Sequence, residues 1–350
     1  MSRTLTLFAS ALLLLAGCFC AARARPDPAA RLFPFFDGNL WGYIDERGGV
    51  VIAPRFGMAG RFREGFARVT IPGRRRGEWA TERLIDTAGR VLNTPKSEAL
   101  GEFSEGLAAI AIPGAGFGYV DASGRVVIKP RFDQAYDFSD GLAPVYVRGR
   151  IGYIDRTGRL VIKPRFTRAA VSWAEPFSEG LAPVQIDGGK EGYIDEGGRV
   201  VIPPLFDIAW PFSEGLALVQ TYGADANRYS FIDHAGRVRI DGKFFHAGSF
   251  SEGLAPVIAG GAGDGLGYID ESGAFRIPPR FDWGEGFSEG RAAVRVKGKW
   301  GYIDTAGKMV VAPQFDSAMQ YTGGLARVGS EEGWGYIDRQ GAWVWRAKRK

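Results

Sequence analysis

The fold is decided by residues 152–186, which read GYIDRTGRLVIKPRFTRAAVSWAEPFSEGLAPVQI. The first four letters, or a close variant of them, recur nine times in the 350 residues, and every copy ends in aspartate. These aspartates are Asp45, Asp86, Asp121, Asp155, Asp195, Asp233, Asp270, Asp304 and Asp338. Their spacings are 41, 35, 34, 40, 38, 37, 34 and 34 residues, which is a period of about 34 with insertions. A period of this size indicates a repeat architecture.

Each unit predicts three short antiparallel strands. The aspartate begins a D-x-x-G sequence, in which Asp favours the first position of a tight turn and Gly supplies the positive φ. The β-branched run that follows, such as residues 126–128, forms a hairpin with G-Y-I-D. We expect this run to end at the P-x-F motif, because proline cannot donate a ladder hydrogen bond. The motif F-S-E-G-L-A then leads into a third strand, such as residues 181–186, and no segment predicts a long helix.

The unit resembles the WG repeat, also called the KWG repeat, of a bacterial protein family. Lys299-Trp300-Gly301-Tyr302-Ile303-Asp304 matches the family signature letter for letter, and Trp41-Gly42 and Trp334-Gly335 keep the Trp–Gly pair. The second unit, with Arg83-Leu84-Ile85-Asp86, is degenerate. The resemblance covers about residues 32–346. It implies a β-rich tandem array, and it brings no activity, catalytic residue or ligand with it.

The units must fold together, because one three-stranded meander cannot bury enough apolar surface to offset its chain entropy. We therefore expect an all-β array of nine units with a shared core of Phe, Tyr and Ile. Leu32-Phe33-Pro34 mirrors Leu181-Ala182-Pro183, so the first unit is complete, and the last ends after its own strand at residues 342–345. A ring closed by strand exchange often divides one unit between the termini, so these complete ends favour an open, superhelical, solenoid-like stack. A closed β-propeller-like ring is the alternative.

The N-terminus predicts export. Met1 to Arg3 is positively charged, and residues 5–16 form an apolar run of 12 residues, too short to cross a bilayer. Leu15-Ala16-Gly17-Cys18 resembles the lipobox of bacterial lipoproteins, which implies a lipid anchor on Cys18. Phe19 stands where inner-membrane retention in enteric bacteria uses aspartate, so we expect the outer membrane. The alternative is cleavage after Ala22-Arg23-Ala24 and a secreted or periplasmic protein.

These features divide the chain into four parts. Residues 1–17 are the expected signal peptide, and residues 18–31 are a linker after the lipidated cysteine. Residues 32–346 are the domain of nine repeats. Residues 347–350 are a basic tail.

The charge distribution argues against nucleic-acid binding. The chain has 44 Lys and Arg against 39 Asp and Glu, a net charge of +5. Arg3 and the four basic residues of the segment 346–350 account for this excess, so the body of the protein is neutral. Nucleic-acid binding needs a patterned basic face, which the repeats do not predict.

The repeated polar residues do not predict catalysis. An acid–base pair needs two unique carboxylates in one pocket, whereas the Asp recurs in every unit and acts as a turn builder. We expect the glutamate of F-S-E-G to bond backbone amides or the arginine of P-R-F. With two His and two Cys in the chain, no metal site is indicated either. We therefore expect a non-enzyme that has no cofactor.

Aromatic residues are the candidate binding site. Between P-x-F and F-S-E-G several units carry an extra ring, namely Tyr136, Trp173, Trp210 and Trp283. Loops on the same edge of successive units would align these rings in a row, which suits sugars or extended peptides. The alternative is that each ring covers the core of its own unit.

The sequence thus predicts a non-catalytic lipoprotein scaffold of the cell envelope that binds a protein or peptide. Recognition of cell-wall or surface polysaccharide through the aromatic row is a second hypothesis. A glycan hydrolase is a third, for which no unique catalytic set is visible.

Overall fold

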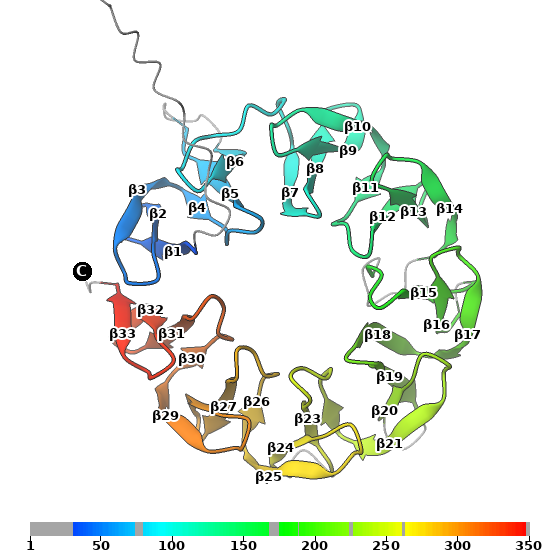
Figure 1. Cartoon of the computed structure of the whole chain (residues 1–350), viewed down its shortest axis with the longest axis vertical. Coiled ribbons are helices and arrows are strands. Elements are labelled where there is room, and N and C mark those ends of the chain that lie inside the picture. Colours follow the sequence, from blue (N-terminus) through cyan, green and yellow to red (C-terminus); the bar gives the residue numbers. More distant parts are fainter. Residues whose placement is uncertain are drawn as a thin grey trace, which may run out of the picture.

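The computed structural model of the chain describes residues 31–73, 80–167, 175–187, 189–223, 227–260 and 263–347. These residues form nine small antiparallel sheets arranged in a ring (Figure 1). We call the sheets blades 1 to 9 in chain order. In the described ranges, no helix has the length and apolarity needed to span a bilayer. The predicted signal peptide, Cys18 and residues 348–350 of the predicted tail lie outside these ranges.

The strands of each blade pair in chain order. Blades 1 to 3 contain β1 (Phe33–Phe36), β2 (Trp41–Ile44), β3 (Val50–Phe56); β4 (Met58–Ala59), β5 (Phe66–Ile71), β6 (Thr81–Asp86); and β7 (Ala99–Ser104), β8 (Leu107–Ile112), β9 (Gly116–Asp121), β10 (Val126–Phe132). Blades 4 to 6 contain β11 (Gln134–Ala135), β12 (Leu142–Val147), β13 (Arg150–Asp155), β14 (Leu160–Phe166); β15 (Leu181–Gln185), β16 (Glu191–Asp195), β17 (Val200–Phe206); and β18 (Ile208–Ser213), β19 (Leu216–Tyr222), β20 (Asn227–Ile232), β21 (Val238–Phe244). Blades 7 to 9 contain β22 (His246–Ala247), β23 (Ala255–Ile258), β24 (Leu266–Ile269), β25 (Phe275–Phe281); β26 (Trp283–Gly284), β27 (Ala292–Val296), β28 (Lys299–Ile303), β29 (Met309–Phe315); and β30 (Ser317–Ala318), β31 (Ala326–Ser330), β32 (Gly333–Ile337), β33 (Trp343–Arg346).

Blade 4 shows how one unit becomes a sheet. β12 carries L-A-P, β13 carries G-Y-I-D and β14 carries the β-branched run, so the three predicted strands are confirmed. The structure adds a two-residue strand, β11, which pairs with β12. The prediction missed this strand because two residues are too few to show an alternating pattern.

The repeated aspartate builds the turn between the second and third main strands. In blade 1, Oδ1 of Asp45 accepts hydrogen bonds from the amides of Arg47 at 2.9 Å and Gly49 at 2.8 Å. The amide of Asp45 in turn donates to the carbonyl of Gly49 at 2.9 Å. These bonds hold the aspartate at the turn, which confirms its predicted structural role.

The prediction that the outer strand ends at P-x-F is wrong. β3 continues through Pro54 to Phe56, and the register shifts between Ile52 and Phe56. Proline is tolerated there because β3 is the edge strand of its sheet and the ladder is bulged. The bulge also explains the glycine of W-G: a Cβ on Gly42 would lie 2.5 Å from the carbonyl oxygen of Ile52.

The two units without this glycine support the explanation. In blade 2 the position is Arg83, and the chain after β6 makes only one isolated bridge, between Ile85 and Val91, among the described residues. In blade 6 the position is Ser230, and the partner strand has no proline and pairs Ser230 with Asp241. A side chain at this position therefore excludes the proline-containing bulge.

Neighbouring blades share their cores, as predicted. Between blades 6 and 7, Leu216 and Phe231 of one blade pack in a single cluster with Phe250 and Val257 of the next. Similar clusters fill the other junctions, and their members are almost all less than a tenth exposed. Each blade thus depends on both neighbours for burial of its apolar faces.

The prediction of an open, solenoid-like stack is wrong, and the alternative of a closed propeller-like ring is right. Blades 1 and 9 meet (Figure 1), and the hydroxyl of Tyr336 donates to the carbonyl of Pro34 at 2.9 Å. Phe33 and Phe35 of β1 pack there against Leu325 and Tyr336. Among the described strands none crosses this seam, since β1 to β3 build blade 1 and β30 to β33 build blade 9. Complete terminal units are therefore compatible with a ring.

Candidate functional site

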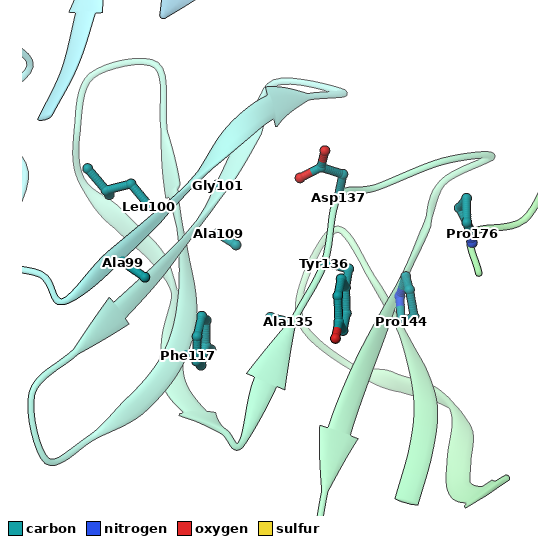
Figure 2. A pocket seen from close by; sticks show the side chains of 10 residues that line it. All are labelled: Ala99, Leu100, Gly101, Ala109, Phe117, Ala135, Tyr136, Asp137, Pro144 and Pro176. Carbon is teal, nitrogen blue, oxygen red and sulfur yellow. The ribbon is translucent and has the colours of Figure 1, made fainter. Parts of the chain in front are cut away.

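Tyr136 lies in a cavity of about 390 Å³ between blades 3 and 4. Figure 2 shows Tyr136 and Pro144 on one side of the cavity and Phe117 on the other. The hydroxyl of Tyr136 donates to Oε1 of Gln134 at 2.9 Å, while its carbonyl accepts from Tyr119 at 2.7 Å. The ring is therefore half-buried and fixed between two blades.

The carboxylate of Asp137 lines the same cavity and joins it to the turns of the neighbouring blades. Burial raises the pKa of Asp137, and the nearby Arg63 opposes this rise. One guanidinium nitrogen of Arg63 lies 3.3 Å from Asp137 and 3.4 Å from Glu102. Arg63 thus neutralises two carboxylates that belong to the next two blades.

Trp210 and Trp283 belong to one continuous row of rings. The ring of Trp210 lies 6.1 Å from Tyr229, Tyr229 lies 6.4 Å from His246, and His246 lies 4.5 Å from Trp283. Burial lowers the pKa of His246, and the nearby Glu285 only partly opposes this change. The lowered pKa favours a neutral imidazole. This row spans blades 6 to 8.

The row differs from the predicted one. Among the described residues no ring contact links Tyr136 to it, and Trp173 lies outside the described residues. Trp210 and Trp283 also pack against the cores of their junctions, so each ring covers apolar side chains as well. Tyr229 and His246 were not among the predicted site residues. Tyr229 stands at the Trp position of W-G, and His246 stands two residues after Phe244 as Trp283 does after Phe281.

The acidic residues of the F-S-E-G turns form a second repeated set. Each carboxylate accepts hydrogen bonds from backbone amides of the following blade's turn, at 2.6–3.3 Å. The seven residues are Glu64, Glu105, Asp140, Glu179, Glu214, Glu252 and Glu289. The predicted bond to backbone amides is confirmed. We call this set the carboxylate relay.

The relay places its residues in an unusual backbone conformation. All seven have positive φ, between 49° and 56°. Each begins a two-residue turn that Gly completes, and asparagine or glycine is the usual choice at that place. A longer acidic side chain is retained because it reaches the next blade.

Three further kinds of bond recur at the junctions between blades. The serine of F-S-E-G donates to the next blade, as Ser213 does to the carbonyl of Phe250 at 2.9 Å. The arginine of P-R-F also reaches the next blade, as Arg55 does to the carbonyl of Gly89 at 2.6 Å. The tyrosine of G-Y-I-D donates to the carbonyl 17 residues on, as Tyr193 does to that of Trp210 at 2.7 Å. Because these side chains bond to backbone carbonyls of the neighbouring blade, we assign them a structural role.

The largest of the described cavities lies where the ring closes. We call it the seam pocket, with a volume of about 790 Å³. Its walls come from the segment before β1, the turn between β4 and β5, and the turn between β30 and β31. The lining residues include Arg31, Phe33, Arg61, Phe62, Arg63, Glu64, Gly65, Glu102, Thr322, Gly323, Arg327 and Tyr336.

The seam pocket is positively charged. Arg31, Arg61 and Arg327 form no ion pair with any residue in the described ranges. The guanidinium of Arg327 lies 4.3 Å from the centre of the Trp334 ring. Of the two glutamates in the wall, Glu102 faces Arg63 and Glu64 belongs to the relay. The pocket can therefore hold a negatively charged group beside aromatic rings.

The seam pocket was not predicted, although the sequences of two repeats depart from the consensus where they line it. Arg61-Phe62-Arg63 replaces the usual residues around the phenylalanine of F-S-E-G, and Thr322-Gly323-Gly324 replaces S-E-G. Both departures from the consensus line the pocket. Within the described part of the chain, no group of three or more His, Cys, Asp or Glu side chains could hold a metal ion.

One solved structure shares the overall fold of this chain, and two others match it with TM-scores below 0.5. A eukaryotic initiation factor matches with a TM-score of 0.63 and 12% identity, over 91% of this chain and 96% of that one. BamB from Moraxella catarrhalis matches with a TM-score of 0.41 and 13% identity, over 89% and 96%. The designed protein Ika8 matches with a TM-score of 0.45 and 12% identity, over 78% and 92%. At these identities the likeness concerns the fold alone.

The family comparison is more specific. No curated protein matches the chain. The family described as WG containing repeat matches residues 41–71, 117–150, 151–189, 192–223, 229–261, 267–300 and 300–330. The unmatched stretch 72–116 holds the degenerate second unit. These segments cover more than half of the sequence, and the chain therefore belongs to the WG-repeat family.

Proposed function

We propose that the protein is a non-catalytic binding scaffold, exported to the cell envelope, that holds a protein or peptide at the seam pocket. The observation that carries the proposal is the seam pocket itself. It is concave, large enough for several residues of an extended chain, and lined by rings beside arginines, three of which form no ion pair with the described residues. Aromatic residues and arginine are the side chains enriched where proteins bind each other.

Selection of peptides by the full chain tests this function. The detergent-purified protein is immobilised and panned against a displayed peptide library, and recovered peptides are measured by fluorescence anisotropy. We expect peptides whose binding weakens about tenfold in the pocket variant Arg327→Gln, which loses a guanidinium. The matched control Arg276→Gln removes an arginine on blade 7 whose side chain is 68% exposed. Equal binding by both variants, or no recovered peptide, would contradict the proposal.

The anchor is part of the same proposal. Lipidation of Cys18 would hold the ring at a membrane surface, since a lipoprotein carries more than one acyl chain. Labelled palmitate should enter the wild-type protein and the matched variant Cys20→Ala, and it should be absent from Cys18→Ala. Persistent label in Cys18→Ala would refute the anchor.

A second candidate function rests on the row of Trp210, Tyr229, His246 and Trp283. Rings at contact distance along a scaffold suit stacking on sugars. Binding of cell-wall glycans on an array should then disappear in the double variant Trp210→Ala, Trp283→Ala. Trp343→Ala, which changes a Trp outside the row, is the control. Glycan binding that survives the double variant removes this candidate.

A further inference from the structure

The carboxylate relay is interrupted at the seam. Among the described turns, the relay begins at Glu64 and ends at the amides of Gly323 and Gly324. Blade 9 carries Gly323 at the acidic position. In the register that aligns Leu32-Phe33-Pro34 with Leu181-Ala182-Pro183, the acidic position of blade 1 falls on Ala30. The two blades that close the ring therefore supply no carboxylate.

The interruption leaves donors without acceptors. The amides of Glu64 and Gly65 are the counterparts of amides that receive a carboxylate in later blades, such as those of Glu105 and Gly106. Neither amide has an acceptor among the residues that the structure describes. Both residues line the seam pocket. A pair of amide donors with nothing to bind is an anion site if a ligand can reach it.

The pocket cannot be filled by blade 9 itself. A Cβ on Gly323 would lie 3.2 Å from Cδ of Arg31 and 3.2 Å from Cζ of Phe33, and its φ is +64°. The relay shows that acidic residues hold a similar φ, so the obstacle to a glutamate here is crowding against Arg31 and Phe33. Arg31 takes this space and adds positive charge to the pocket.

Arg61 and Arg327 line the same pocket as the amides of Glu64 and Gly65. Arg61 is three residues before Glu64, and Arg327 lies across the pocket on β31. Burial raises the pKa of Tyr336, which lines the pocket, to about 12, and the fields of Arg327 and Arg61 oppose this rise. Both guanidiniums are therefore close enough to stabilise a negative charge in the pocket.

We propose that the seam pocket binds a carboxylate of an acidic peptide, which accepts hydrogen bonds from the amides of Glu64 and Gly65 beside Arg61 and Arg327. The inference rests on the proposed function and names the class of partner. The fold itself places an Asp or Glu carboxylate on these turn amides seven times, three times on both amides and four times on the glycine amide alone, so an acidic peptide is the best match. The carboxylate is an Asp or Glu side chain or the C-terminus of the peptide.

The test uses labelled hexaglutamate and the full chain in detergent, with fluorescence anisotropy as the readout. We expect binding that weakens with salt, and no binding of hexaglutamine. Arg61→Gln and Arg327→Gln should each weaken binding about tenfold or more, while Arg276→Gln should not change it. Amidation of the C-terminus distinguishes the two sources: unchanged affinity indicates a side-chain carboxylate, and lost affinity indicates the terminus.

A carboxylate supplied by the chain itself tests whether the ligand binds the amides of Glu64 and Gly65, and it leaves every arginine in place. Ala30→Glu restores the acidic position of blade 1, so it should weaken hexaglutamate binding, whereas Ala30→Gln should weaken it less. Thermal unfolding of every variant confirms that the ring is intact. Binding that is equal in Arg61→Gln, Arg327→Gln and wild type overturns the inference, as does tighter binding of oligogalacturonate than of hexaglutamate.

The outcomes separate this inference from the proposed function. If hexaglutamate fails but peptides selected from the library bind and depend on Arg327, the scaffold function stands and the carboxylate assignment falls. If no peptide binds at all, both fall.

Discussion

The junction between blades 6 and 7 and the seam between blades 9 and 1 bring blades together by different means. At the interior junction, Ser213 donates to the carbonyl of Phe250 and Glu214 accepts from the amide of Glu252 at 2.7 Å. At the seam, Thr322 and Gly323 occupy the corresponding positions. There the rings of Phe35 and Trp345 meet at 5.3 Å, and Trp41 and Trp334 meet at 5.7 Å.

This difference shows which contacts must be the same at every junction of the ring and which can vary from one junction to another. Both kinds of junction share a buried apolar cluster, so apolar packing is the common requirement. The polar links between turns are repeated inside the ring and replaced by aromatic packing at its closure. The same replacement leaves the amides and arginines of the seam pocket available to a ligand.

The largest expected effect comes from breaking the seam. Phe35 is 5% exposed, and Phe35→Ala removes its ring from the closing cluster. We expect a loss of about 3–5 kcal/mol in the free energy of unfolding, measured in urea. Small-angle scattering should also show a larger radius if the ring opens. The control Phe275→Ala, at a side chain that is 39% exposed, should cost far less. Equal costs would mean that the seam is not held by its rings.

The next prediction tests whether blade 9, which closes the ring, has the same internal packing as blade 8. A Cβ on Gly301 would collide with the carbonyl of Val311, and one on Gly335 with that of Trp345. Gly301→Ala in blade 8 and Gly335→Ala in blade 9 should therefore cost similar amounts, about 1–3 kcal/mol by denaturant unfolding. Gly57→Ala, whose nearest atom would be 3.5 Å away, is the control. A much smaller cost at Gly335 would mean that blade 9 itself is packed differently from blade 8, and that the seam is not the only difference between them.

A smaller effect distinguishes the polar links. Ser213→Ala removes the bond to Phe250 and should cost about 1 kcal/mol, whereas Thr322→Ala at the seam should cost about half of that or less. Thr322 donates a side-chain hydrogen bond to none of the residues in the described ranges.

The backbone of Glu214 gives a related test. Glu214→Gly should lower the free energy of unfolding less than Glu214→Gln does, because glycine relieves the φ of 56°. The opposite order would mean that the hydrogen bonds to this side chain, which glutamine can still accept, outweigh the relief of backbone strain.

The smallest effect is the response of the turns to acid. Desolvation opposes the change, but hydrogen bonds from Ser123 and Arg125 lower the pKa of Asp121 to about 2. A lowered pKa means that the charged form stabilises the folded state above the ordinary pKa, and that this contribution is lost as the pH falls toward the folded value. The melting temperature of the wild type should therefore approach that of Asp121→Asn between about pH 5 and about pH 2. A difference that stays constant over this range would contradict the assignment.

The sequence predicted the strands and turns because their signals are local. Asp155 and Gly158 mark a turn, and the alternation after Gly180 marks a strand, without reference to distant residues. Pro54 was misread because its place in an edge bulge depends on the partner strand. The closed ring was named only as the alternative to an open stack, since closure depends on the small rotation added by every blade.

The candidate site was predicted in part for the same reason. Trp210 and Trp283 were identified one by one, but the rings that join them, Tyr229 and His246, lie on other strands. The seam pocket combines Arg31 with Arg327, which lie at opposite ends of the repeat domain. Only the closure of the ring brings them together, and no local pattern contains it.

The bond from Tyr336 to Pro34 joins residues 302 positions apart. The strand that it holds, β1, is made first during synthesis, and its partner blade is made last. The apolar face of β1 toward the seam therefore stays uncovered while the other blades are added in turn. The seam can therefore form only after blade 9 has been made, because until then β1 has no partner blade on that side.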